Sequence, residues 1–289
     1  GELIAVEYLK DKYQALGISP AQANGDYFQN VPLKVIKTPK VNILIDGANF
    51  IYYDDFIAVS SGETTTIEVD EFTFAGYGIK STLYNDYENL DVSGKLVVAI
   101  KGEPKDEDGK YLVTGSKDRS KWSNGRQSLS SKRNIAKELG AKAFILIDQA
   151  MFKRYSSYYK AVEERGGEST LALDVDSKSY YGFLGGKKLG DQLIQSSNGT
   201  FKKDIKITFN NSSEPITSKN VVAILPGTEK PDEYIILSAH LDHIGMHDGE
   251  VFNGADDDGS GTVAILEIAE ASTKVLELNK TVSFLFVVE

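Results

Sequence analysis

The chain has 289 residues, of which 41% are hydrophobic, so it can bury a sizeable core in one large domain or two. Its formal net charge of -10 argues against a nucleic-acid partner, because such partners are normally bound through basic patches. The absence of cysteine excludes disulfides, thiolate catalysis and cysteine-based zinc sites. No apolar run approaches the roughly 20 residues that a membrane helix needs, so no membrane span is predicted.

The first part of the chain changes from a helical to a strand-like pattern. Residues 3–16 repeat apolar side chains on one helical face, and Gly17 is a plausible stop, so a helix is predicted there. After Pro20 the chain is rich in turns, and the alternating runs at residues 41–45 and 64–69 predict short strands.

The middle of the chain contains one regular unit. Residues 95–100 predict a buried strand, which a polar loop follows at about residues 105–126. Residues 131–139 then predict a short helix that Gly140 ends, and residues 143–147 predict a second strand. This order of elements indicates a small α/β module.

The last eighty residues are the most regular. Strands are predicted at residues 220–225, 234–239 and 282–288, with a helix from Thr262 to about Leu278 between the last two. This order implies a parallel sheet with helices on its faces, whose ligands bind beyond the carboxyl ends of the strands.

Two of these elements are expected to be well buried. The strand at residues 234–239 is nearly all apolar, as in a sheet that is covered on both faces. The helix is expected to bury five apolar side chains, namely Val263, Ile265, Leu266, Ile268 and Ala269.

All three histidines of the chain lie between His240 and His247. His240 and Asp242 alternate at the end of a predicted strand, so both side chains are expected to point to one face. Neutral imidazole is a good zinc ligand, and a carboxylate on its other ring nitrogen fixes the tautomer. A single histidine at a strand end is more often a structural polar residue, so the metal interpretation depends on the acidic residues that follow.

Residues 256–258 are three consecutive aspartates in a glycine-flanked turn before a predicted helix. Helix capping explains one of them, but three carboxylates repel one another unless a cation compensates, which indicates a bound metal. An EF-hand calcium loop does not fit: with Gly259 as its sixth residue, Gly254 and Ile265 would be its first and twelfth. The chain also lacks a phosphate-binding P-loop, a dinucleotide fingerprint and a G-x-S-x-G elbow.

Residues 238–243, then 253–261, then a helix, resemble the metal-binding core of the co-catalytic zinc aminopeptidases of bacterial leucyl aminopeptidase type. Their superfamily includes glutamate carboxypeptidase and the transferrin receptor. Residues 216–227 also resemble the strand that leads into this core. The resemblance implies an α/β fold, with a parallel-rich mixed sheet and helices on both faces.

The middle segment resembles the protease-associated (PA) domain, a small α/β domain that many members carry as an insertion. The residues that carry this likeness are 74–79, 86–87, 90–95 and 140–143. The resemblance therefore predicts the N-terminal part of a peptidase domain at residues 1–70 and a PA domain at 71–210. Residues 211–289 are then the metal-binding first part of the peptidase domain, incomplete at its C-terminus.

By resemblance, His240 would bind one of two zinc ions and Asp257 would bridge both. Asp242 would orient His240, and the peptide bond between Asp257 and Asp258 would be cis. Zinc is therefore the expected cofactor, with two ions in the intact site.

Family members carry a Glu-Glu pair after the last strand, in which the first residue is a general base and the second a zinc ligand. By strict spacing from Phe284, Glu289 falls one position short of the base, and a slip of one residue would make it the base itself. Further aspartate and histidine ligands follow in the family. With one histidine and one bridging carboxylate, this chain is expected to be a fragment that binds zinc weakly and catalyses nothing alone.

The function implied for the intact protein is zinc-dependent removal of N-terminal residues from peptides. One alternative is a non-catalytic, receptor-like binding protein on the same scaffold, although His240 and Asp257 favour an enzyme. Another is a carboxypeptidase or glutaminyl cyclase of the same fold. Peptide substrates are the expected partners. Export to the periplasm or the outside is expected from the family, although residues 1–5 carry no signal-peptide pattern.

Overall fold

The computed structural model describes residues 2–59, 63–165, 169–174, 180–247, 249–275 and 278–287. The chain forms two compact units. The first unit comprises Gly1–Lys34, Ala172–Val175 and Pro215–Glu289, and the second comprises Val35–Leu171 and Asp176–Glu214. Across the described ranges, no helix is both long and apolar enough to cross a bilayer.

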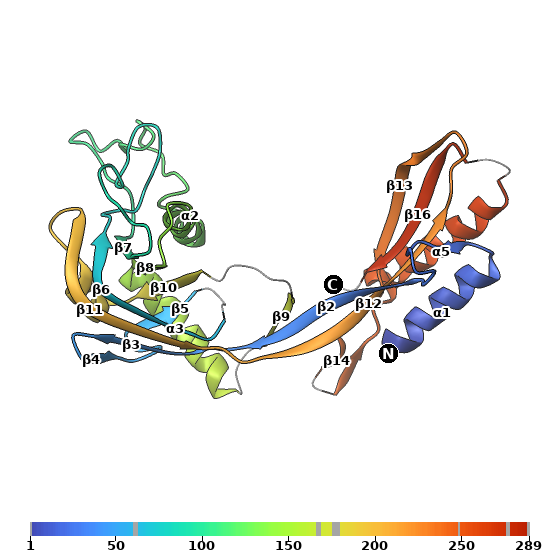
Figure 1. The fold of residues 1–289 in the computed structure, drawn as a ribbon, viewed down its shortest axis with the longest axis horizontal. Helices are drawn as coiled ribbons and strands as arrows, with labels where there is room; N and C mark the ends of the chain where they lie inside the picture. Colours follow the sequence, from blue (N-terminus) through green and yellow to red (C-terminus); the bar gives the residue numbers. More distant parts are fainter. Residues whose placement is uncertain are drawn as a thin grey trace. The chain divides into compact units, whose positions relative to one another are not determined.

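The first unit is built on a mixed sheet whose strands run in the order β13-β16-β12-β2-β9, with β1 paired to β12 (Figure 1). Strands β13 and β16 are parallel, whereas β12 is antiparallel to β16. These strands are β1 (Ser19–Pro20), β2 (Phe28–Lys37), β9 (Ser169–Leu173), β12 (Ser213–Leu225), β13 (Lys230–His240) and β16 (Lys280–Val287). The remaining elements are α1 (Glu2–Ala15), the hairpin strands β14 (Gly245–His247) and β15 (Glu250–Phe252), the turn η1 (Ala255–Gly259) and α5 (Ser260–Thr273).

One face of this sheet carries the core of the first unit. Val282, Phe284 and Phe286 alternate along β16 and are all buried. Tyr13 of α1 packs against the two phenylalanines, with ring centroids 6.0 and 5.9 Å apart. Helix α5 adds its buried residues to the same cluster, so both helices cover one face. The α/β class predicted from the sequence is confirmed.

Burial of β13 differs from the sequence prediction. Tyr234 and Ile236 are 58% and 63% exposed, and β13 stands at the end of the order of the described strands. Their register partners are Thr281 and Ser283 of β16, which lie on the face opposite to the helices. The expectation that both faces of this strand are covered is therefore wrong for the residues that the structure describes.

Helix α5 also buries less than predicted. Ile265 and Ala269, one turn apart, are its buried residues, and Leu266 is partly buried against the same core. Val263 and Ile268 are exposed, so the prediction that they are buried is wrong. The helix contacts the sheet along a narrower stripe than its apolar composition suggests.

The second unit is built on a sheet of eight strands in the order β4-β3-β11-β6-β7-β8-β10-β5. Strands β6, β7, β8 and β10 are parallel to one another, and the outer pairs are antiparallel. The strands are β3 (Lys40–Ile45), β4 (Ala48–Phe50), β5 (Phe56–Ala58), β6 (Thr65–Phe74), β7 (Leu96–Ile100), β8 (Ala143–Ile147), β10 (Tyr181–Gly185) and β11 (Gly199–Asn210). The helices are α2 (Gly125–Glu138), α3 (Gln149–Glu164) and α4 (Lys187–Leu193).

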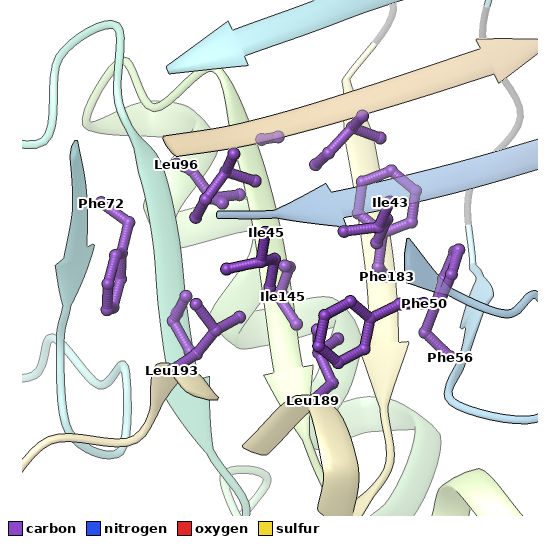
Figure 2. Close-up of a cluster of buried hydrophobic side chains, with 14 of the residues drawn as sticks. Ile43, Ile45, Phe50, Phe56, Phe72, Leu96, Ile145, Phe183, Leu189 and Leu193 are labelled. Carbon is purple, nitrogen blue, oxygen red and sulfur yellow. The ribbon is translucent and has the colours of Figure 1, made fainter. Parts of the chain in front are cut away.

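Two apolar layers cover the two faces of this second sheet. Strands β7 and β8 place alternate side chains in each layer. Figure 2 shows one layer, to which α4 contributes Leu189 and Leu193. Helices α2 and α3 pack in the other layer. The predicted unit of strand, loop, helix and strand is confirmed as β7, α2 and β8, although α2 begins at Gly125 rather than at Ser131.

The compact units divide the chain at other residues than 70 and 210, and the predicted domain boundaries there stay predictions. The second unit already begins at Val35 and continues to Glu214, apart from residues 172–175. The reason is strand pairing: β3 pairs with β11, and β11 pairs with β6, so residues 40–74 belong to the second sheet. The interpretation of this unit as a PA domain stays a prediction.

Candidate metal centre

The candidate centre lies where strand β13 ends. His240 is the last residue of β13 and pairs with Val287 of the parallel strand β16. The amide of Leu241 donates to the carbonyl oxygen of Val287 at 2.9 Å. Parallel strands bring their carboxyl ends to one edge of a sheet, and polar groups that follow them are available to a ligand there. The predicted position of His240 at such an edge is confirmed.

The three aspartates occupy the turn η1 directly before helix α5. Gly254 opens this turn with a φ of 63°, and the amide of Gly259 donates to its carbonyl oxygen at 2.9 Å. The peptide bond between Asp257 and Asp258 is cis, as the family resemblance implies. The hydrogen bond between Gly259 and Gly254 closes the turn around the three aspartates.

His240 and Asp257, which are seventeen residues apart in the chain, meet through their side chains. Nε2 of His240 lies 2.9 Å from Oδ1 of Asp257. The side chain of His240 is only 16% exposed, whereas that of Asp257 is 77% exposed. The strand end therefore holds one partner firmly, and the turn presents the other toward solvent.

The second ring nitrogen of His240 has a different partner. Nδ1 lies 2.9 Å from the main-chain carbonyl oxygen of Asp242 and 3.8 Å from Oδ1 of its carboxylate. A carbonyl oxygen can only accept, so Nδ1 carries the hydrogen and donates it. The orienting hydrogen bond at Asp242 is thus made by its main chain, and the predicted carboxylate contact is longer than a hydrogen bond.

This tautomer leaves two acceptors facing each other. With the hydrogen on Nδ1, a neutral ring has a lone pair on Nε2, and that lone pair points at a carboxylate oxygen 2.9 Å away. Two such atoms attract only when a proton or a metal cation lies between them. Imidazole nitrogen and carboxylate oxygen are both common zinc ligands, so the donor pair fits a zinc ion.

The pair is only part of a metal centre. A structural zinc site has four protein ligands and a catalytic one three. Among the residues that the structure describes, no group of three or more histidine, aspartate or glutamate side chains is arranged to hold a metal ion. Glu289, the predicted base, lies outside the described residues.

The sequence did not predict that the Asp258 carboxylate accepts hydrogen bonds from two main-chain amides next to this centre. Its Oδ1 accepts from the amide of Gly261 at 3.1 Å, and its Oδ2 accepts from the amide of His240 at 3.4 Å. The first contact is a helix cap, which the pattern of an aspartate before a helix does predict for one of the three. The second joins the turn to a strand eighteen residues away, and no local pattern reveals it.

Residues 220–288, which include His240 and Asp257, match Peptidase family M28. The chain is 26% identical to leucine aminopeptidase 1 of Trichoderma harzianum over 65% of its own length and 53% of that protein. It is 34% identical to aminopeptidase NAALADL1 of Mus musculus over 28% of its own length and 10% of that protein. The predicted resemblance to the zinc aminopeptidases is therefore confirmed for this segment.

Among solved structures, an aminopeptidase from Aneurinibacillus sp. strain AM-1 aligns with 99% of this chain and 56% of that chain. The identity is 18% and the TM-score 0.38, which is a coarse resemblance. The chain spans about half the length of leucine aminopeptidase 1 and a smaller share of NAALADL1.

Proposed function

We propose that the chain supplies part of the active centre of a zinc-dependent aminopeptidase, with His240 and Asp257 as zinc ligands. The observation that carries this proposal is the pair of converging acceptors, Nε2 of His240 and Oδ1 of Asp257, 2.9 Å apart. Asp257 is mostly exposed, so its second carboxylate oxygen is available to a second ion. The match of residues 220–288 to a peptidase family supports the same assignment.

Each residue of the centre has a separate task. Zinc bound there supplies a Lewis acid for the scissile carbonyl and lowers the pKa of a water molecule. His240 donates its Nδ1 proton to the carbonyl oxygen of Asp242, which leaves the lone pair of a neutral ring on Nε2, the atom that would bind a metal. Asp242 is therefore a positioning residue. Glu289 lies outside the described residues, and strict family spacing places it one position before the general base. With a slip of one residue it would itself transfer the water proton to the leaving amine.

The substrate class follows from the relatives. Both curated relatives are named as aminopeptidases, so peptides with a free N-terminus are the proposed substrates. Export of the protein to the periplasm or the outside, which the family resemblance implies, is part of the same proposal. Because the chain spans about half of leucine aminopeptidase 1, the activity proposed is that of the whole protein.

Zinc titration of this chain by calorimetry tests the ligand assignment. We expect saturable binding that His240→Ala and Asp257→Asn each weaken by more than about tenfold, because each removes one of the two donors. Asp256→Asn is the matched control, since it removes one charge from the same turn. Equal zinc binding by the wild type and His240→Ala would refute the assignment.

Hydrolysis of an aminoacyl-nitroanilide by the whole protein tests the activity. We expect a chelator to abolish hydrolysis and added zinc to restore it, and we expect blocking of the substrate's amino group to prevent cleavage. Activity that is indifferent to chelation would exclude the zinc mechanism. Cleavage of a substrate with a blocked amino group would instead favour a carboxypeptidase.

A further inference from the structure

The carboxylate of Asp258 joins two parts of the candidate centre that are distant in sequence. One oxygen accepts from the amide of Gly261, in the first turn of α5, at 3.1 Å. The other accepts from the amide of His240, at the end of β13, at 3.4 Å. A single side chain thus ties the metal-ligand strand to the start of the helix.

Gly261 leaves the space that this contact needs. A Cβ atom at position 261 would lie 2.2 Å from Oδ1 of Asp258 and 2.7 Å from its Cγ. Real Cβ atoms essentially never approach other atoms so closely, so any larger residue would displace the carboxylate. The backbone of Gly261 is in an ordinary helical conformation. Glycine is therefore needed here for space and not for its backbone freedom.

The position of Asp257 depends on the same contact. Asp257 is directly followed by Asp258, and its own side chain is 77% exposed, so little packing holds it. Its location opposite His240 is consequently set by the backbone of the turn. Thr262 adds one more link, because its Oγ1 donates to the carbonyl oxygen of His240 at 3.2 Å.

We propose that Asp258 is a positioning residue that holds Nε2 of His240 and the carboxylate of Asp257 at ligand separation, in a space that Gly261 keeps open. This inference rests on the proposed zinc centre. Loss of the Asp258 carboxylate leaves the hydrogen bond of Thr262 as the remaining described side-chain hydrogen bond between the strand end and the helix start, so the two ligands are held less firmly before the metal binds. Groups that orient metal ligands change metal affinity by roughly 10–100-fold.

The experiment compares zinc affinity with metal-free stability in variants of this chain. Asp258→Asn replaces one of the two accepting oxygens with an NH2 group, which cannot accept a hydrogen bond from the main-chain amide that it faces. We expect it to weaken zinc binding by about tenfold or more, measured by calorimetry. Asp256→Asn removes the same charge from the same turn, and its side chain makes no hydrogen bond with the described residues. We expect this control to change affinity by less than about threefold, the effect of an exposed charge.

Gly261→Ala disturbs the same contact by adding a Cβ atom on the helix side, and it leaves all three aspartates in place. We expect it to weaken zinc binding as Asp258→Asn does, and to alter the visible spectrum of the cobalt-substituted protein in the same way. Thermal unfolding without metal provides the structural readout. Both effects are expressed as free energies. If a variant loses more binding free energy for zinc than free energy of unfolding without metal, the positioning role is supported, and if it loses equal amounts of both, the positioning role is overturned.

The outcomes separate this inference from the proposed function. If the wild type binds zinc through His240 but Asp258→Asn binds it as Asp256→Asn does, the positioning role is refuted and the zinc centre stands. If this chain alone does not bind zinc, the same variants are compared in the whole protein, and the absence of zinc binding there refutes the zinc centre and the positioning role with it.

Discussion

Lys132 provides a test of how the second unit accommodates a buried cation. Its side chain is fully buried, and Nζ donates to the carbonyl oxygens of Ile100 at 2.9 Å and Gly102 at 2.7 Å. Burial lowers the pKa of Lys132 from 10.5 to about 8, and it outweighs nearby carboxylates that act in the opposite direction. The stability of the protein should therefore depend on pH in this range.

The direction of the effect follows from the two pKa values. Below pH 8 the lysine is protonated in the folded and the unfolded chain, so the full cost of the buried charge is present. Between pH 8 and 10.5 the unfolded chain still holds the proton that the folded chain has released, so the free energy of unfolding rises with pH. The slope is at most about 1.4 kcal/mol per pH unit, which gives a gain of about 3 kcal/mol across the window.

The assay is urea unfolding of the wild type and Lys132→Met, at several pH values across this window. Subtracting the two free energies of unfolding cancels the ionisation of the tyrosines, which both proteins share. We expect the free energy of unfolding of the wild type to rise relative to that of Lys132→Met as the pH rises. Lys137 is an exposed lysine of the same helix, and Lys137→Met is the control. The difference in free energy of unfolding between the wild type and Lys137→Met should not rise in this way. A difference between wild type and Lys132→Met that does not change with pH would refute the reasoning.

Three further predictions concern the first unit. Tyr13→Phe should raise the free energy of unfolding by about 1–2 kcal/mol, because the buried hydroxyl of Tyr13 has no hydrogen-bond partner among the described residues. A lower free energy of unfolding for the variant, measured with urea, would contradict this. Phe284→Ala should lower it by about 3–5 kcal/mol, because the fully buried ring packs between sheet and helix; a loss below about 1 kcal/mol would show that this core is not packed as described. Zinc at about tenfold its dissociation constant should stabilise the wild type by about 1.4 kcal/mol and His240→Ala by less than about 0.4 kcal/mol, measured by thermal unfolding; equal stabilisation of both proteins would place the metal elsewhere.

Much of the fold was predictable where the signal is local. The strands at residues 96–100 and 143–147 and the helix at residues 2–15 lie within a few residues of their predicted positions. The two strands are continuous apolar runs, and the helix has a periodic apolar face. A glycine lies close to one end of each, namely Gly102, Gly140 and Gly17, and both kinds of signal act over a few residues. The region from 151 to 210, which has weaker signals, contains most of α3, all of α4 and three strands, none of which the sequence pattern specified.

The assignment of strands to sheets was not predictable in the same way. Residues 41–45 and 64–69 are predicted as short strands, but the pairing of β3 and β6 with β11, more than 120 residues later, decides that they belong to the second unit. Likewise, the apolar run of β13 predicts a central strand, and the strand order places it at an edge. Pairing partners are set by long-range contacts, which no local pattern encodes.

The sequence by itself determined the chemistry of the candidate centre. A histidine at a strand end and an aspartate triplet before a helix predict imidazole and carboxylate as the candidate ligands, and this pattern is visible in the local sequence. Tertiary structure alone decided their geometry. It brought Nε2 of His240 to 2.9 Å from Asp257, gave the orienting hydrogen bond to the main chain of Asp242, and joined strand and helix through Asp258. Those distances depend on how β13, η1 and α5 pack together, because hydrogen bonds between distant residues form only once the chain has folded.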